Sequence, residues 1–173
     1  MSSAYLATAV RFVVLAALHV LVFAHLGEAT TWGPYVQVVL YPLAIMLLPV
    51  GTPSVLVLLI AFALGSVIDF SLGTYGLHAA ALVLSGFARR LLLGLLEPRE
   101  GYGADVSPTR GRFGTAWFAR YAALYLVIHL LAFFAIEAFT FVYWGEILLR
   151  TAGSFCVSML LILLYALVLD PRR

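Results

Sequence analysis

The sequence predicts an all-α integral membrane protein, built as a bundle of six transmembrane helices. Of its 173 residues 64% are hydrophobic, and its mean hydropathy is +1.08. Only 10% of the residues are charged, against about 25% in a typical soluble domain. So few charges cannot cover a water-facing surface of this size, and we therefore expect the apolar side chains to face lipid. The length allows a single membrane domain, residues 1–173.

Six apolar stretches approach the roughly 20 residues that a helix needs to cross a bilayer. We expect the helices at residues 4–26, 35–50, 53–70, 75–96, 115–137 and 144–169. The first places Arg11 before an apolar run, as a signal peptide does. It also carries His19 and His25 and lacks a small-x-small cleavage site, so we expect it to be retained as a span. The second is the shortest of the six.

Glycine and proline mark the connections between these spans. LPVGTP, residues 48–53, predicts a tight turn between the second and third spans. SLGTYG supplies Gly73 and Gly76 for a turn between the third and fourth. The longest connection, residues 97–114, holds three acids and three arginines among glycines and prolines. We interpret it as a cytoplasmic connecting loop.

The basic residues predict the orientation of the chain. All ten are arginines. With both termini in the cytoplasm, nine lie on cytoplasmic segments and only Arg150 lies outside, which is the bias expected of membrane proteins. The pI of about 8.9 therefore reflects topology and does not indicate nucleic-acid binding. The absence of lysine excludes Schiff-base chemistry, and the single Cys156 excludes an intrachain disulfide.

Asp69 and His78 flank the turn between the third and fourth spans, where they can reach each other. An Asp–His contact orients the imidazole in hydrolases. However, neither Ser71 nor Ser85 lies in the G-x-S-x-G context of a nucleophile. We therefore expect a buried polar tie that fixes the hairpin. Small residues from Ala79 to Gly86 would let another helix come close.

Other ionisable groups lie within or beside the spans. They are His19, His25, His129, Glu137, Glu146 and Arg150. The spacing of the histidines does not supply the three or four ligands of a zinc site, so we expect hydrogen bonds between helices. Glu146 and Arg150 stand four apart in the order that favours a helical ion pair, and we expect them to pair. Glu137 is expected as a solvated helix end.

Arg89 and Arg90 lie about 16–18 Å beyond His78 along the same predicted helix. We expect them near the cytoplasmic headgroups, where arginine reaches the phosphates of membrane lipids. Because apolar residues continue after them, one of the two can instead face the bundle and hold another protein.

Residues 58–93, LLIAFALGSVIDFSLGTYGLHAAALVLSGFARRLLL, resemble the signature hairpin of the MreD rod shape-determining family. That family has Gly-x-x-x-Asp at the end of one membrane helix, a short turn with glycine, and Gly-(Leu/Met)-His-Ala at the start of the next. The matching residues are Gly65, Asp69, Gly73, Gly76, Leu77, His78 and Ala79. LLEPREGY, residues 95–102, and the final LLILLYALVLDPRR resemble the Bacteroidota-type branch.

The resemblance implies a non-enzymatic scaffold or regulator of the rod complex (elongasome) in the bacterial inner membrane, supporting peptidoglycan synthesis and cell shape. The implied partners are an MreC-like protein, a RodA-type glycosyltransferase, a class B penicillin-binding protein and the actin-like MreB. The implied fold is similar to the substrate-binding component of energy-coupling-factor transporters. No catalytic residue, cofactor or metal is implied. Candidate partner-binding or structural residues are Asp69, Gly73, Gly76, His78, Gly86, Arg89 and Arg90.

Two other functions stay open on the sequence. A transporter component for a vitamin-type small molecule would have an outward pocket with convergent polar groups. The residues available to line it are Trp32, Asp69, Tyr75, His78 and Glu137. An intramembrane enzyme would need a nucleophile and a base placed together.

Overall fold

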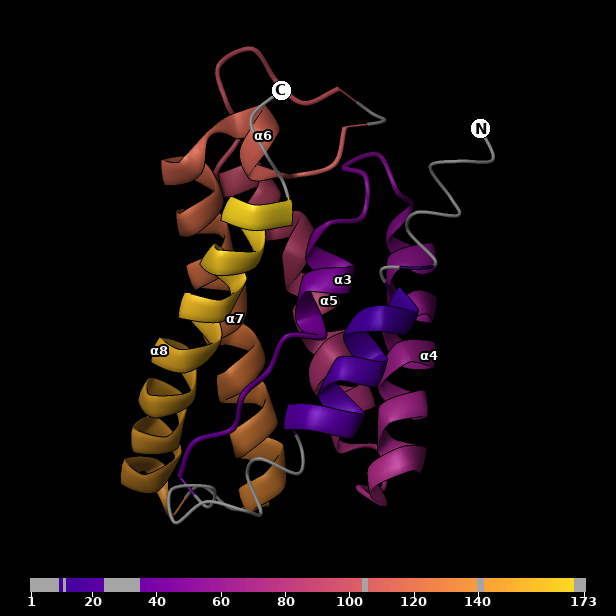
Figure 1. Ribbon diagram of the computed structural model, residues 1–173, viewed down its shortest axis with the longest axis vertical. Helices are drawn as coiled ribbons and strands as arrows, with labels where there is room; N and C mark the ends of the chain where they lie inside the picture. The colour runs from indigo at the N-terminus through magenta and orange to yellow at the C-terminus, as the bar shows by residue number, and fades with distance from the viewer. Residues whose placement is uncertain (1–9, 11, 24–34, 104–105, 140–141, 170–173) are drawn as a thin grey trace.

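The computed structural model describes residues 10, 12–23, 35–103, 106–139 and 142–169 (Figure 1). Within these residues the regular secondary structure is entirely helical. Four helices of the described part are long and apolar enough to cross a membrane. They are α4 (Ser54–Leu72), α5 (Leu77–Leu95), α7 (Thr115–Ala138) and α8 (Trp144–Leu169). They confirm the helices predicted at 53–70, 75–96, 115–137 and 144–169, with ends that differ by at most two residues.

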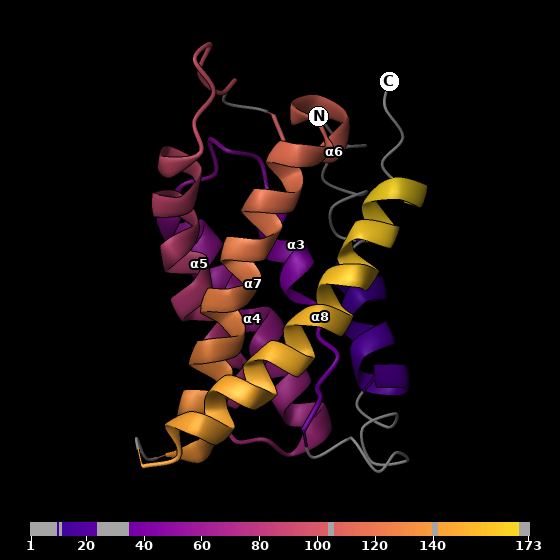
Figure 2. The same cartoon turned by 90° about the vertical axis from the view of Figure 1, so that its left-hand side faces the viewer.

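The long helices pack in chain order. α4 packs on α5, α5 on α7, and α7 on α8, and α8 runs obliquely to α7 (Figure 2). An apolar helix at Phe12–Val22 covers part of α4, and its last turn is the π-helical η1 (His19–Phe23). The rest of the predicted first span, including His25, lies outside the described residues.

The predicted membrane helix at 35–50 is wrong. Residues 36–40 have no regular secondary structure and follow a stretched path, and only the five residues of α3 (Pro42–Met46) are helical (Figure 1). Every residue from Val39 to Leu48 is buried, and the segment runs through the middle of the bundle (Figure 1). Its side chains are apolar because they form the protein core, whereas the prediction took them to face lipid.

Serines of α8 hold the extended segment in place. The Gln37 N–H donates to the Ser154 hydroxyl and the Val39 N–H to the Ser158 hydroxyl, both at 2.9 Å. At membrane depth an irregular backbone needs such partners, because no water is there to satisfy it. Pro42, which has no N–H to satisfy, then begins α3.

Most of the described arginines gather at one end of the bundle. This arginine-rich end comprises Arg89, Arg90, Arg99, Arg110, Arg112 and Arg120, and it includes the short α6 (Arg110–Phe113). Aromatic side chains close it: Tyr102 donates to the Leu93 carbonyl at 2.9 Å and Trp117 to the Leu96 carbonyl at 2.7 Å. These bonds satisfy carbonyls at the end of α5, which have no partner within their own helix.

Candidate functional site: the α4–α5 hairpin

α4 and α5 make unusually close contact near the turn that joins them. A Cβ added to Gly65 would lie 2.3 Å from the Ala79 Cα and 2.5 Å from the Ala79 nitrogen. Only a residue without a side chain fits between the two backbones. One helical turn later on the same face of α4, Asp69 therefore meets the first turn of α5.

Asp69 is buried and caps α5 from the preceding helix. Its Oδ1 accepts from the His78 N–H and its Oδ2 from the Ala79 N–H, each at 2.9 Å. The residue at the N-cap position, Gly76, has no side chain to do this. A carboxylate at a helix N-terminus is also favoured by the helix dipole. The cap of α5 thus comes from a residue of α4. These bonds fix the two helices of the hairpin relative to each other.

The Asp69 carboxylate also joins the turn to the His78 ring. His78 Nδ1 lies 2.9 Å from Oδ1, and the Thr74 hydroxyl donates to the same oxygen. The turn needs glycine at both ends, since Gly73 has φ +69° and Gly76 has φ +94°. The expected Asp69–His78 tie and the expected turn glycines are therefore all present.

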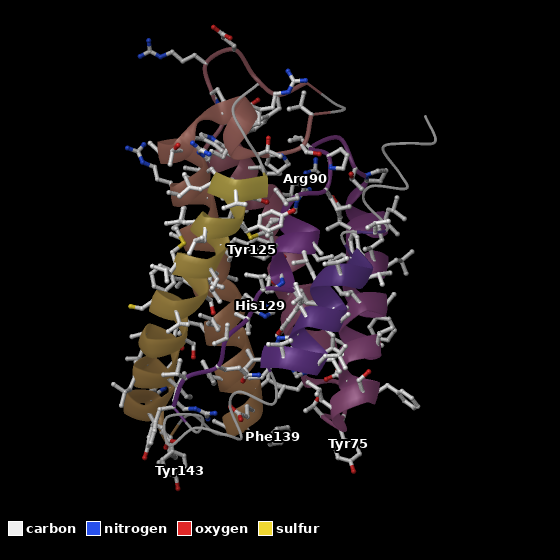
Figure 3. All side chains as sticks on the ribbon, in the orientation of Figure 1. Tyr75, Arg90, Tyr125, His129, Phe139 and Tyr143 are labelled. Carbon is white, nitrogen blue, oxygen red and sulfur yellow. The ribbon has the colours of Figure 1, made fainter. Side chains whose placement is uncertain are left out.

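The other edge of the His78 ring faces a buried cluster that the sequence did not predict as a unit. We call His19, Tyr41, His78 and His129 the histidine cluster. Ring centroids lie 4.4 Å apart for His19 and Tyr41, 5.5 Å for His19 and His78, and 5.6 Å for Tyr41 and His78. All four side chains are buried, and Figure 3 shows His129 in the middle of the bundle.

Some ring nitrogens of this cluster are hydrogen-bonded and others, among the described residues, are not. His129 bonds through Nε2 to the Tyr41 hydroxyl at 2.8 Å and through Nδ1 to the Ser85 hydroxyl at 3.1 Å. This confirms the expected bonding of His129 to other segments. Within the described residues, both His19 nitrogens and His78 Nε2 have no hydrogen-bond partner. The same part of the chain offers no group of three or more His, Cys, Asp or Glu side chains placed to hold a metal ion.

A groove runs along the outer face of the hairpin, beside the Asp69 cap. This hairpin groove has a volume of about 610 Å³. Its lining residues are Phe62, Ser66, Asp69, Phe70, Gly73, Tyr75, Gly76, Ala79, Ala80 and Val83. Small residues dominate its α5 wall, whereas Phe70 and Tyr75 stand almost fully exposed, and Figure 3 shows Tyr75 pointing away from the bundle.

The remaining candidate residues lie from the middle of α5 toward its C-terminal end. Gly86 faces the Ala61 side chain on α4 with ordinary spacing. Arg90 is exposed, whereas Arg89 turns inward. Arg89 Nη2 donates to the Leu48 and Pro49 carbonyls of its own chain. These residues are therefore separate from the Asp69 cap.

The predicted Glu146–Arg150 pair is wrong. Arg150 binds Glu137 across the α7–α8 contact, with Nη1 2.8 Å from Oε2 and Nη2 3.1 Å from Oε1. Its guanidinium also lies 4.6 Å from the centre of the Phe134 ring. The planar guanidinium of Arg150 can bond to both carboxylate oxygens of Glu137 and stack on a ring at the same time. This geometry explains why Arg150 pairs with Glu137 and not with Glu146 on its own helix. Glu137 is consequently an ion-pair partner and not a free helix end.

Of the described residues that could line a transporter pocket, Asp69 and Tyr75 line the hairpin groove, whereas His78 and Glu137 do not. Asp69 and His78 are buried and bonded to each other, Glu137 is bonded to Arg150, and Tyr75 points outward. Trp32 lies outside the described residues.

Comparison of the chain with protein-family models, curated proteins and solved structures gives no match. Function must therefore be argued from the geometry of the hairpin.

Proposed function

We propose that this protein is a non-enzymatic membrane scaffold whose α4–α5 hairpin binds the single transmembrane helix of a partner protein. The observation that carries the proposal is the hairpin groove, in which a wall of small residues adjoins a rigidly capped helix start. Helices in lipid gain little from burying apolar surface. They associate where small residues let backbones approach and where a few polar groups bond across.

The dimensions of the groove suit a helix. From Phe62 to Gly73 its α4 wall covers eleven residue steps, which is about 16 Å or three helical turns. Gly76, Ala79 and Ala80 leave room along the facing wall, and Ser66 offers a hydroxyl. The exposed side chains of Phe70 and Tyr75 would contact the end of the partner's transmembrane helix near the turn.

Rigidity of the groove supports the same function. Asp69 lines the groove and bonds to the first turn of α5, so the two walls are fixed relative to each other before any partner arrives. A preformed surface loses less conformational entropy on binding than one that must be ordered.

The resemblance to the MreD family supplies the identity of the partner. We propose that the guest is the membrane anchor of an MreC-like protein, within a complex that also holds a RodA-type glycosyltransferase, a class B penicillin-binding protein and MreB. The proposed setting is the bacterial inner membrane. The proposed topology has six crossings, the second made by the buried, partly helical segment at residues 35–50 and not by a membrane helix. Both termini and the arginine-rich end lie on the cytoplasmic side, in keeping with the positive-inside bias.

Co-purification of groove variants from the native membrane tests the proposal. Ala80 is exposed in the groove, and Ala80→Leu fills it without touching the core. We expect about a 5- to 150-fold weaker association with the MreC-like protein, and a corresponding loss of it on co-purification, since overpacking costs about 1–3 kcal/mol. Ala152→Leu adds the same side chain at an exposed position on α8 and should retain the partner.

Two outcomes would overturn the proposal. One is a wild-type preparation that brings down neither an MreC-like protein nor the wall synthases. The other is a stoichiometric vitamin-like molecule in the purified protein, which would favour the transporter function.

A further inference from the structure

A cavity of about 450 Å³ opens at the arginine-rich end, far from the hairpin groove. It lies between the turn that precedes α4, the first turn of α4 and the last turns of α5. The residues that matter for its chemistry are Thr52, Ser54, Arg89, Arg90, Glu97 and Tyr102. Nothing in the scaffold proposal requires this cavity.

Arg89 brings a buried positive charge to the cavity. Its side chain is 3% exposed. Nη2 donates to the Leu48 and Pro49 carbonyls, whereas Nε has no hydrogen-bond partner within the described residues. Among those residues no carboxylate forms an ion pair with it. A buried charge without a counterion is costly, so an anion that enters the cavity would be strongly favoured.

The start of α4 adds backbone donors to the same cavity. The helix follows Pro53, whose side chain supplies no cap. The first N–H groups of a helix have no acceptor within it, and together with the helix dipole they form a natural site for an anion. The hydroxyl groups of Thr52 and Ser54 line the cavity beside them.

The charges that line the cavity match a phosphodiester. Arg90 is exposed at its edge and adds a second positive charge, while exposed Glu97 adds one negative charge. Two arginines and one glutamate, the charged residues in the described lining, leave a net charge of +1. A phosphodiester carries a single negative charge and accepts hydrogen bonds from arginine in paired geometry.

The depth of the cavity corresponds to the headgroup layer. α4 and α5 have 19 residues each, so each is about 28 Å long and its ends lie near the limits of the hydrocarbon core. Tyr102 and Trp117 lie at this same end, as aromatic residues do at membrane interfaces. We infer that the cavity binds a phosphate group, carried either by an anionic phospholipid headgroup or by a soluble phosphate compound at the membrane surface.

Native mass spectrometry of the full-length protein in detergent, titrated with phosphatidylglycerol, tests this inference. Diacylglycerol is the phosphate-free control. Arg90→Gln should weaken binding about three- to fivefold, as expected for an exposed charge. Arg89→Lys keeps the charge but loses the planar fork, and it should weaken binding about tenfold. Glu97→Gln should strengthen binding, because it removes the opposing charge.

Arg120→Gln is the matched control, since Arg120 is exposed at the same end but lies outside the cavity lining. It should leave the affinity unchanged, and thermal unfolding of each variant shows that the fold is retained. Competition by inorganic phosphate would assign the site to a soluble phosphate compound, whereas resistance to phosphate would assign it to lipid. Equal losses for Arg90→Gln and Arg120→Gln, or diacylglycerol binding as tight as that of phosphatidylglycerol, would overturn the inference.

Discussion

Gly65 on α4 lies directly against the backbone of Ala79 on α5, at a separation that leaves no room for a methyl group. This contact sets the register of the hairpin. It places Asp69, one turn further along α4, within hydrogen-bond distance of the His78 and Ala79 amides. The spacing of Gly65 and Asp69 therefore has a physical cause, because one residue permits the approach and the other bonds across it.

Gly65→Ala should destabilise the protein by about 1–3 kcal/mol or more, as overpacking does when backbone must move. Gly86→Ala is the control, because its added Cβ would meet the Ala61 Cβ at an ordinary 3.5 Å. Thermal unfolding in detergent measures both. Equal melting temperatures for the two variants would show that the close approach does not constrain the hairpin.

Asp69→Asn should cost about 2–3 kcal/mol, because hydrogen bonds to a buried charged group are among the strongest. Asp69 now accepts a hydrogen bond from each of two backbone N–H groups. The amide nitrogen of asparagine is a donor, and it would face one of these N–H groups without an acceptor between them. Ser71→Ala, two residues away, removes only an exposed bond to the Val67 carbonyl and should be close to neutral. Denaturant unfolding of the pair tests the difference, and a neutral Asp69→Asn would contradict the capping role.

Ser158→Ala should expose the Val39 amide to exchange and destabilise the protein by about 1–3 kcal/mol, since it leaves a buried donor unsatisfied. Ser154→Ala frees the Gln37 amide, which is only partly buried, so its effect should be smaller. Hydrogen–deuterium exchange resolves the two positions separately. Unchanged protection of Val39 in Ser158→Ala would mean that the serine does not hold the extended segment.

Glu137→Gln should lower stability by about 0.5–1 kcal/mol, the range for a partly exposed ion pair. Part of this difference should vanish at high salt, because exposed charges are screened. Glu146→Gln should have no effect, because both terminal nitrogens of Arg150 bind Glu137. Melting temperatures at low and high salt provide the measurement. The reverse order of effects would restore the pair expected from the sequence.

The hairpin could be predicted because its determinants are local. Asp69 and His78 are nine residues apart, and the glycines that turn the chain lie between them. The long helices could be predicted because apolar residues that face lipid form continuous runs of the right length.

The 35–50 segment could not be predicted, because hydropathy gives the same value to a side chain facing lipid and to one buried in protein. The serines that satisfy its backbone lie 117 and 119 residues further along the chain. A large separation in sequence likewise prevented prediction of the histidine cluster, since Tyr41 and His129 are 88 residues apart. The close approach at Gly65 could not be predicted, because the sequence does not show that Ala79 faces it.

The extended segment also constrains how the protein is made. Gln37 and Val39 leave the ribosome long before Ser154 and Ser158, the residues that accept their amide hydrogens. Until α8 enters the membrane, the segment has no acceptors for these groups in hydrocarbon. We therefore expect residues 35–41 to stay in a watery or protein-lined surrounding until the last described helix arrives, so that insertion does not proceed strictly one helix at a time.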